Sequence, residues 1–298
     1  MTLKDWQQSG NFFRFQGYQI FYQKAGTGPT LLLLHGFPTA SWDWNKLWQP
    51  LQSHFNVLAI DFLGFGFSDK PRQPYTIMQQ ADIVTAFLKD QHVVVYHLLA
   101  HDYGDTVAQE LLARSNSITN ENPSNLPQLL SLCLLNGGLF PETHKPLLIQ
   151  RVLMSPLGAW VAKLFTKKRL KKNFDRIFGP ATQPTARNID DFWTLMVHNN
   201  GKQVFHLLIR YMQQRKEYRS RWVGALQQSV VSVRLINGAS DPISGAHMMA
   251  LYRQLIPEAD VVSLAEIGHY PQIEAAPKVL QYYLDFYKNL KADKSNIL

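Results

Sequence analysis

One stretch constrains the fold more than any other: a largely apolar run that reaches a tight turn and continues at once in a helical pattern. The run covers 93–100, and Val107, Leu111 and Leu112 follow it at helical spacing. Such a run is typical of a strand buried on both faces of a sheet. The sequence therefore predicts a strand, a sharp turn centred on Asp102, and a helix.

The turn at Asp102 also predicts chemistry. The small residues Ala100 and Gly104 lie two positions either side of it, as a strained strand-to-helix turn requires. This is the pattern of a nucleophile elbow, usually G-x-S-x-G, with aspartate in place of serine. A carboxylate can displace a leaving group from saturated carbon and form an ester with the enzyme. The alternative is that Asp102 only caps the following helix, a position that aspartate favours.

Strand and helix patterns alternate along most of the chain. The strands are expected at 11–25 (two short strands), 30–34, 55–60, 93–100, 129–135, 230–236 and 260–264. Long apolar strands that alternate with helices favour an α/β fold, with a mostly parallel eight-stranded sheet flanked by helices.

The pattern changes in one internal region. Residues 140–226 lack an apolar strand, and their apolar residues recur at helical spacing, which predicts an inserted helical cap. The expected organisation is a core formed by 1–139 and 227–298, interrupted by the cap at 140–226. The polar segment 115–127, with two prolines, is expected to be a surface loop.

Three candidate catalytic residues follow predicted strands. Asp102 is the expected nucleophile, Asp241 follows the penultimate strand, and His269 follows the last one. Functional groups of such sheets gather at the carboxyl ends of the strands. The order nucleophile, acid, histidine suits an elbow-type site, in which Asp241 would orient His269. Glu142, after the preceding strand, is a weaker alternative to Asp241.

An oxyanion hole is expected beside the elbow. When His269 activates water against an ester on Asp102, negative charge develops on a carboxyl oxygen. The backbone N–H groups of Phe37 and Tyr103 are the expected donors, because Gly36 permits a close approach.

Taken together, these motifs resemble the α/β-hydrolase superfamily over nearly the whole chain. Aspartate at the elbow resembles the branch of epoxide hydrolases and haloalkane dehalogenases. The strings His-Asp-Tyr-Gly-Asp at 101–105, Asn-Gly-Gly at 136–138 with Phe-Pro-Glu-Thr-His at 140–144, and Arg-Trp-Val-Gly-Ala-Leu at 221–226 resemble the mesoderm-specific transcript proteins. The resemblance implies a hydrolase with a covalent alkyl-enzyme ester on Asp102. Epoxide hydrolysis is favoured and haloalkane dehalogenation is the alternative.

The resemblance also suggests residues that contact substrate. Epoxide hydrolases use two cap tyrosines to protonate the leaving oxygen, and Tyr211 and Tyr218 are the candidates here. Trp160 stands where a first-half cap tyrosine would be expected, so it is a third candidate. Dehalogenases usually hold halide with a tryptophan beside the nucleophile, whereas this chain has Tyr103 and Phe37 in the neighbouring positions.

Composition narrows the surroundings in which this chemistry would occur. The 298 residues include one cysteine, Cys133, and the N-terminus lacks an apolar segment, so a reducing, cytoplasmic location is expected. No cluster has metal-ligand spacing, and we expect neither a metal nor another cofactor. The expected ligands are a small apolar electrophile and water.

The chain is basic, with a formal net charge of +8. Its densest cluster spans 167–172, and another spans 210–221. Without a recognised nucleic-acid module we expect no nucleic-acid partner. These clusters are expected to be solvated helix faces, with weak attraction of a basic cap to an anionic membrane surface as the alternative. A binding scaffold without catalysis is the rival from a different functional class.

Overall fold

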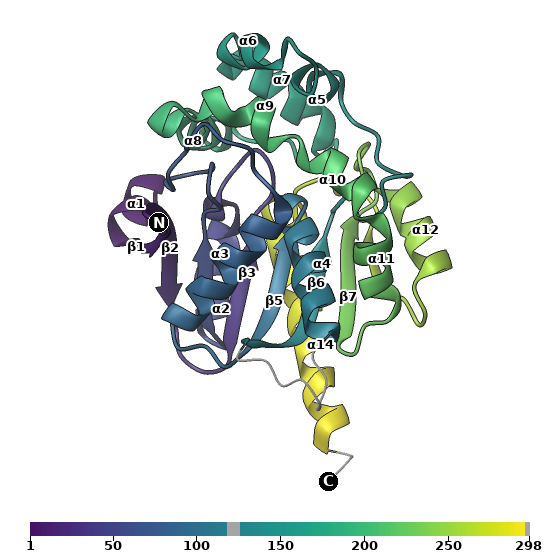
Figure 1. Ribbon diagram of the computed structural model, residues 1–298. Helices are drawn as coiled ribbons and strands as arrows, with labels where there is room; N and C mark the ends of the chain where they lie inside the picture. Colours follow the sequence, from purple (N-terminus) through teal and green to yellow (C-terminus); the bar gives the residue numbers. More distant parts are fainter. Residues whose placement is uncertain (118–125, 296–298) are drawn as a thin grey trace.

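In the computed structural model, an eight-stranded sheet runs through the molecule (Figure 1). The structure describes residues 1–117 and 126–295. The strand order is β1-β2-β4-β3-β5-β6-β7-β8. The strands are β1 (Asn11–Phe15), β2 (Tyr18–Ala25), β3 (Thr30–Leu34), β4 (Asn56–Ile60), β5 (Val95–His101), β6 (Gln128–Leu135), β7 (Ser232–Gly238) and β8 (Asp260–Leu264).

The sheet is parallel from β4 to β8, and β1 and β2 add an antiparallel edge. The central strands are buried on both faces, as the four leucines of β3 illustrate. Such continuous apolar strands need helices on both faces to exclude water. The predicted α/β-hydrolase architecture, with a mostly parallel eight-stranded sheet, is therefore confirmed.

Helices cover the two faces of this sheet. Successive residues of β5 show this. Tyr96 is buried on the side of Arg114 in α4, whereas the ring of His97 packs on Tyr287 of α14, on the other side. The core helices are α1 (Leu3–Ser9), η1 (Ser41–Trp44), α2 (Asn45–Gln52), α3 (Ile77–Asp90), α4 (Tyr103–Asn116), α12 (Ala246–Leu255), α13 (Pro271–Glu274) and α14 (Ala276–Ser295). Helix α4 continues into the segment predicted as a loop, and 118–125 of that segment lie outside the described residues.

The segment 140–226 forms helices and no strand, as predicted. It contains α5 (Leu148–Leu153), α6 (Gly158–Lys163), α7 (Lys167–Ile177), α8 (Ala186–Val197), η2 (His198–Val204), α9 (Phe205–Leu208), α10 (Tyr211–Glu217) and α11 (Arg219–Gln227). Helices α5 to α9 lie above the carboxyl ends of the strands (Figure 1). Helix α11 instead packs on α4 beside the sheet. The cap boundary at residue 226 therefore stays a prediction.

The two longest cap helices, α7 and α8, are each capped at the N-terminus by a threonine hydroxyl that accepts a backbone N–H. The Thr166 hydroxyl accepts the Arg169 N–H at the start of α7, and the Thr185 hydroxyl accepts the Asn188 N–H at the start of α8. Each bond satisfies a donor that the first helical turn leaves unpaired. Several polar contacts tie the cap to the core; in one of them Trp42 donates its indole N–H to Asp191 of α8 at 3.2 Å.

Candidate active site

The elbow at Asp102 has the strained geometry that its sequence predicts. Asp102 has φ +46° and ψ −99°, a backbone conformation that side chains rarely adopt, between the end of β5 and the start of α4. A Cβ added at Gly104 would lie 2.5 Å from the carbonyl oxygen of Leu34, so only glycine allows α4 to approach β3 this closely. The side chain of Asp102 makes no capping bond to α4, which argues against the capping alternative.

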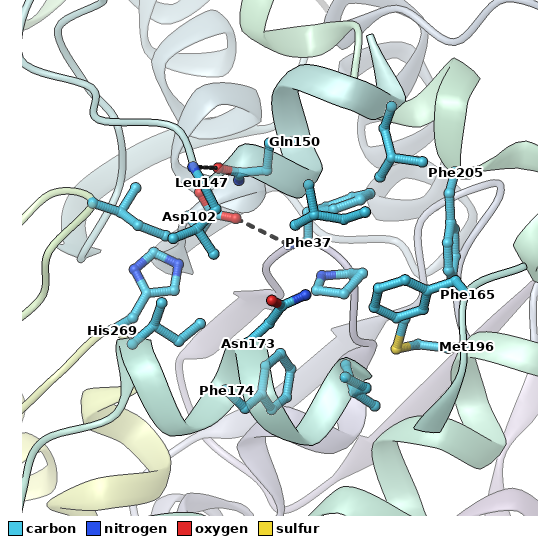
Figure 2. A pocket seen from close by; sticks show the side chains of 16 residues that line it. Phe37, Asp102, Leu147, Gln150, Phe165, Asn173, Phe174, Met196, Phe205 and His269 are labelled. Atoms are coloured by element: carbon cyan, nitrogen blue, oxygen red, sulfur yellow. Dashed lines mark hydrogen bonds between the residues drawn. The ribbon is translucent and has the colours of Figure 1, made fainter. Parts of the chain in front are cut away.

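The Asp102 carboxylate is buried and ionised. Its Oδ2 accepts the backbone N–H of Phe37 at 3.1 Å (Figure 2). Its Oδ1 lies 3.4 Å from Nη2 of Arg215. Burial by itself would raise the pKa of Asp102, but the positive charges of His269 and Arg215 outweigh it and lower that pKa. A charged carboxylate is thus held in a largely apolar setting.

His269 and Asp241 form the second part of the site. His269 Nδ1 donates to Asp241 Oδ2 at 2.8 Å, and both side chains are buried. Asp241 also accepts bonds from the amide of Asn136, the N–H of Ile243 and the hydroxyl of Ser244. These contacts fix the carboxylate, which in turn fixes the imidazole ring and its tautomer.

The charges of this pair reinforce one another. Burial would lower the pKa of His269, but the charge of Asp241 and its hydrogen bond raise that pKa to about 9. Burial would raise the pKa of Asp241, but the charge and hydrogen bond of His269 lower it to about 2. Near neutral pH the pair is therefore an imidazolium beside a carboxylate, with the Asp102 carboxylate also contributing to the raised pKa of His269.

Asp102 and His269 open into one pocket beneath the cap (Figure 2). Its empty space is about 630 Å³, including the part open to solvent. Besides the two catalytic candidates, Gln150 and Asn173 are its polar residues, and the Asn173 amide points towards the centre. The remaining lining is apolar: Phe37, Pro38, Leu147, Ile149, Leu153, Phe165, Leu170, Phe174, Ile177, Met196, Phe205 and Ile243. The pocket suits a small apolar molecule.

The structure places the three predicted substrate contacts of the cap in different surroundings. Tyr211 is buried, and its ring packs on Tyr103 with 4.9 Å between centroids. Trp160 is 64% exposed on α6 and lines a surface groove rather than the pocket, and its contact with substrate stays a prediction. Tyr218 is partly exposed and packs on Trp222. Neither Tyr218 nor Tyr211 is among the residues that line the pocket, and their contacts with substrate stay predictions. Helical spacing alone did not define which face of each cap helix meets the core.

The two predicted oxyanion donors and the alternative acid also have defined places. The Phe37 N–H donates to the Asp102 carboxylate, as described above, and its role in an oxyanion hole stays a prediction. Tyr103 is the first residue of α4, directly after Asp102, and its role as a donor stays a prediction. Glu142 is exposed and paired with Arg219, whereas Asp241 holds His269.

Sequence reasoning missed Arg215. This buried side chain of α10 donates from Nη2 to the carbonyl oxygen of Asp102 at 3.0 Å and from Nε to the Thr106 hydroxyl at 2.7 Å. Its guanidinium lies 4.5 Å from the centroid of the Tyr211 ring. The only sequence signal was its place in a basic cluster that we interpreted as solvated. Asn173 was missed for the same reason, since it follows the lysines of α7.

Fold and site geometry together define a class. The model of the α/β-hydrolase fold family matches residues 29–276. The chain therefore belongs to that family and is an α/β-hydrolase fold hydrolase.

Its relatives within the family agree with the motifs. The chain is 42% identical to the mesoderm-specific transcript protein of Mus musculus over 302 residues, which cover 96% of this chain and 88% of that protein. The Homo sapiens homologue has the same identity and coverage. The putative hydrolase LipZ of Mycobacterium tuberculosis is 35% identical over 276 residues, 92% of this chain and 94% of that protein. The predicted resemblance to mesoderm-specific transcript proteins is thus confirmed.

Solved structures extend the likeness of the fold. The epoxide hydrolase CorEH matches with a TM-score of 0.77 and 17% identity, over 94% of this chain and 99% of that one. The haloalkane dehalogenase DbeA from Bradyrhizobium elkani matches with a TM-score of 0.80 and 17% identity, over 96% and 99%. At such identities these matches establish the fold alone.

Within 1–117 and 126–295, no group of three or more histidine, cysteine, aspartate or glutamate residues is arranged to hold a metal ion. In the same part of the chain, every helix is too short or too polar to cross a membrane.

Proposed function

We propose that this hydrolase acts at saturated carbon through an ester on Asp102, and that its substrates are small apolar epoxides. The observation that carries the proposal is the ionised Asp102 carboxylate in the same apolar pocket as the His269–Asp241 pair. A serine enzyme of this fold would attack carbonyl carbon, whereas a carboxylate suits attack on an alkyl carbon.

In the first step, an oxygen of Asp102 attacks an epoxide carbon, and the ring C–O bond breaks. The leaving oxygen takes a proton from the Tyr211 hydroxyl, which is our candidate acid. Burial raises the pKa of Tyr211, so the hydroxyl keeps its proton until an alkoxide develops nearby. The Arg215 guanidinium, 4.5 Å from the centroid of the Tyr211 ring, would stabilise the phenolate that remains.

In the second step, water hydrolyses the ester. Alkylation neutralises Asp102, and one of the charges that raise the pKa of His269 disappears. The imidazole then loses its proton more readily; that proton returns to the Tyr211 oxygen, and His269 can accept one from water. Water attacks the ester carbon, and the oxyanion that forms is stabilised by the Phe37 N–H. The positive charge of Arg215 acts in the same direction. Cleavage of the ester releases a diol and restores the Asp102 carboxylate.

Haloalkane dehalogenation is the second candidate, and Asn173 is the observation that favours it. Its amide points into the pocket, where an N–H could hold a departing halide. Against it, Phe37 and Tyr103 occupy the positions beside the nucleophile where the halide-binding tryptophan or asparagine of dehalogenases would be expected. In dehalogenation the leaving group would be a halide, and the same ester would form on Asp102.

A panel of short epoxides and haloalkanes tests the proposal. We expect turnover of epoxides, and a loss of about 10⁴-fold or more in kcat for Asp102→Asn, because the amide cannot act as the nucleophile. Full activity of the variant would contradict the mechanism. Tight binding of panel compounds to the wild-type protein without any turnover would instead support the rival of a binding scaffold.

A further inference from the structure

The outer end of the cap carries a cluster of exposed large apolar side chains. Leu148 is 74% exposed, Leu157 65% and Trp160 64%, and all three lie on or beside α5 and α6. Leu164, just after α6, is also exposed. These helices lie at the opposite end of the molecule from the last turns of α14 (Figure 1). Exposed leucine and tryptophan gathered in one place indicate a binding surface.

Exposed apolar residues elsewhere do not cluster in this way. They include Met1, Phe12 and Val230 on separate parts of the core, and Val94 with Val95, which are neighbours at the start of β5. Isolated residues of this kind are normal on a protein surface and need no partner. The cap cluster is therefore a local feature.

Cations flank the apolar cluster. Arg169, Lys172 and Arg176, one above the other on α7, line the same surface groove as Leu148 and Trp160. Within the described residues, none of the three forms an ion pair. By contrast, Lys167 pairs with Asp190, and Lys171 pairs with Asp175. The groove thus combines unneutralised positive charge with an apolar floor.

We propose that this face of the cap docks on an anionic lipid bilayer. Leucine and tryptophan would enter the boundary between headgroups and acyl chains, a position that tryptophan favours. The three free cations would contact anionic headgroups, each contributing to attraction at the surface. A protein partner could also bury the apolar residues. The row of unpaired cations, however, matches the many negative charges of an anionic bilayer surface.

The groove adjoins the active-site pocket. Leu147, Ile149, Phe165 and Asn173 line both. A docked cap would therefore place the entrance of the pocket against the bilayer. If the proposed function holds, the natural substrates are lipophilic epoxides that enter from the membrane rather than from water.

Vesicle flotation with the full chain tests the docking surface. The vesicles are pure phosphatidylcholine, or phosphatidylcholine with about 30% phosphatidylglycerol, an anionic fraction large enough to create a negative surface. We expect the wild-type protein to float with the anionic vesicles, to bind the neutral ones weakly, and to bind less as salt rises.

Two double variants separate the contributions of positive charge and of apolar contact to vesicle binding. Arg169→Glu with Lys172→Glu, and Leu148→Ser with Trp160→Ser, should each reduce the vesicle-bound fraction about tenfold or more. The matched controls are Lys89→Glu with Lys288→Glu and Val94→Ser with Val230→Ser, on exposed residues of the core. The controls should bind as the wild type does. Circular dichroism and thermal unfolding establish that all four double variants are folded.

Three results would overturn the proposal. The first is that the wild-type protein fails to bind anionic vesicles. The second is that the cap variants bind as well as the controls. The third is that sedimentation shows a dimer that is dissociated by Leu148→Ser with Trp160→Ser. The last result would assign the cluster to a second copy of the chain. Ester formation on Asp102 with a short epoxide is measured separately, without vesicles. Arg169→Glu with Lys172→Glu should leave that reaction unchanged, so docking and chemistry can fail independently.

Discussion

The core and the cap hold their functional groups in opposite ways. In the core, the Asp241 carboxylate accepts bonds from His269, Asn136, Ile243 and Ser244, so little freedom is left to it. In the cap, α5, α6, α9 and α10 are only four to seven residues long, and the side chains with which the cap lines the pocket are mainly apolar. Short helices derive most of their stability from packing rather than from their own backbone bonds.

This difference indicates a division of labour. Under the proposed function, the dense hydrogen bonding of the core would define which reaction occurs, because it fixes the charges around Asp102. The apolar packing of the cap would define which molecule enters the pocket. Arg215 is an exception, since it extends from α10 of the cap to the Asp102 backbone and carboxylate in the core. Substitutions on either side should therefore produce different kinds of change.

The largest effect is expected from the core acid. Asp241→Asn should reduce kcat by about 10⁴-fold, because an amide no longer holds the productive tautomer of His269 or stabilises its charge. Steady-state kinetics on the best epoxide of the panel measure it. Glu142→Gln is the matched control, and we expect it to keep wild-type kcat because Glu142 pairs with Arg219 at the surface. A large fall in kcat for Glu142→Gln, with wild-type kcat for Asp241→Asn, would make Glu142 the acid that orients His269.

The link between cap and core should be costly to break. Arg215→Met leaves the buried carboxylate of Asp102 without its guanidinium, and we expect the free energy of unfolding to fall by about 3 kcal/mol. Urea unfolding measures it. Arg219→Met removes a cation from an exposed pair and should cost less than about 1 kcal/mol. Equal losses in both variants would mean that Arg215 does not stabilise the nucleophile.

Acid should destabilise the core through His101. Its ring donates to the carbonyl oxygen of His269, and burial lowers its pKa to about 4. Between pH 6.5 and 4 the unfolded chain therefore binds a proton that the folded protein does not, so stability falls as pH falls. The expected slope from this one group is about 1.4 kcal/mol per pH unit. Urea unfolding across this range should lose that part of the slope in His101→Gln, and an unchanged slope would contradict a neutral His101.

The smallest effect is expected in the pocket lining of the cap. Asn173→Leu removes a polar group from the pocket, and KM for epoxides should rise about fivefold, the equivalent of one lost hydrogen bond of about 1 kcal/mol. We expect kcat on epoxides to change little. A large fall in kcat on haloalkanes, with epoxides unaffected, would instead favour the dehalogenase alternative.

The sequence predicted the core far better than the cap. Asp102, Asp241 and His269 follow apolar strands, and parallel strands bring their carboxyl ends to one edge of the sheet. In the cap, helical spacing predicted helices but not their orientation. Tyr211 is buried beside the nucleophile, whereas Trp160 is exposed to solvent. Arg215 was hidden in a basic cluster, because its partner is 113 positions away in the chain and only the fold brings the two together.

The ester on Asp102 is the central claim, and trapping it is the most direct test. His269→Gln removes the base that activates water, so the alkylated enzyme should accumulate during a single turnover. Intact mass spectrometry should then show a gain equal to the mass of the added epoxide, and peptide mapping should place it on Asp102. Turnover by the wild-type protein without an adduct on Asp102 in the variant, or with the adduct on a different residue, would contradict the account.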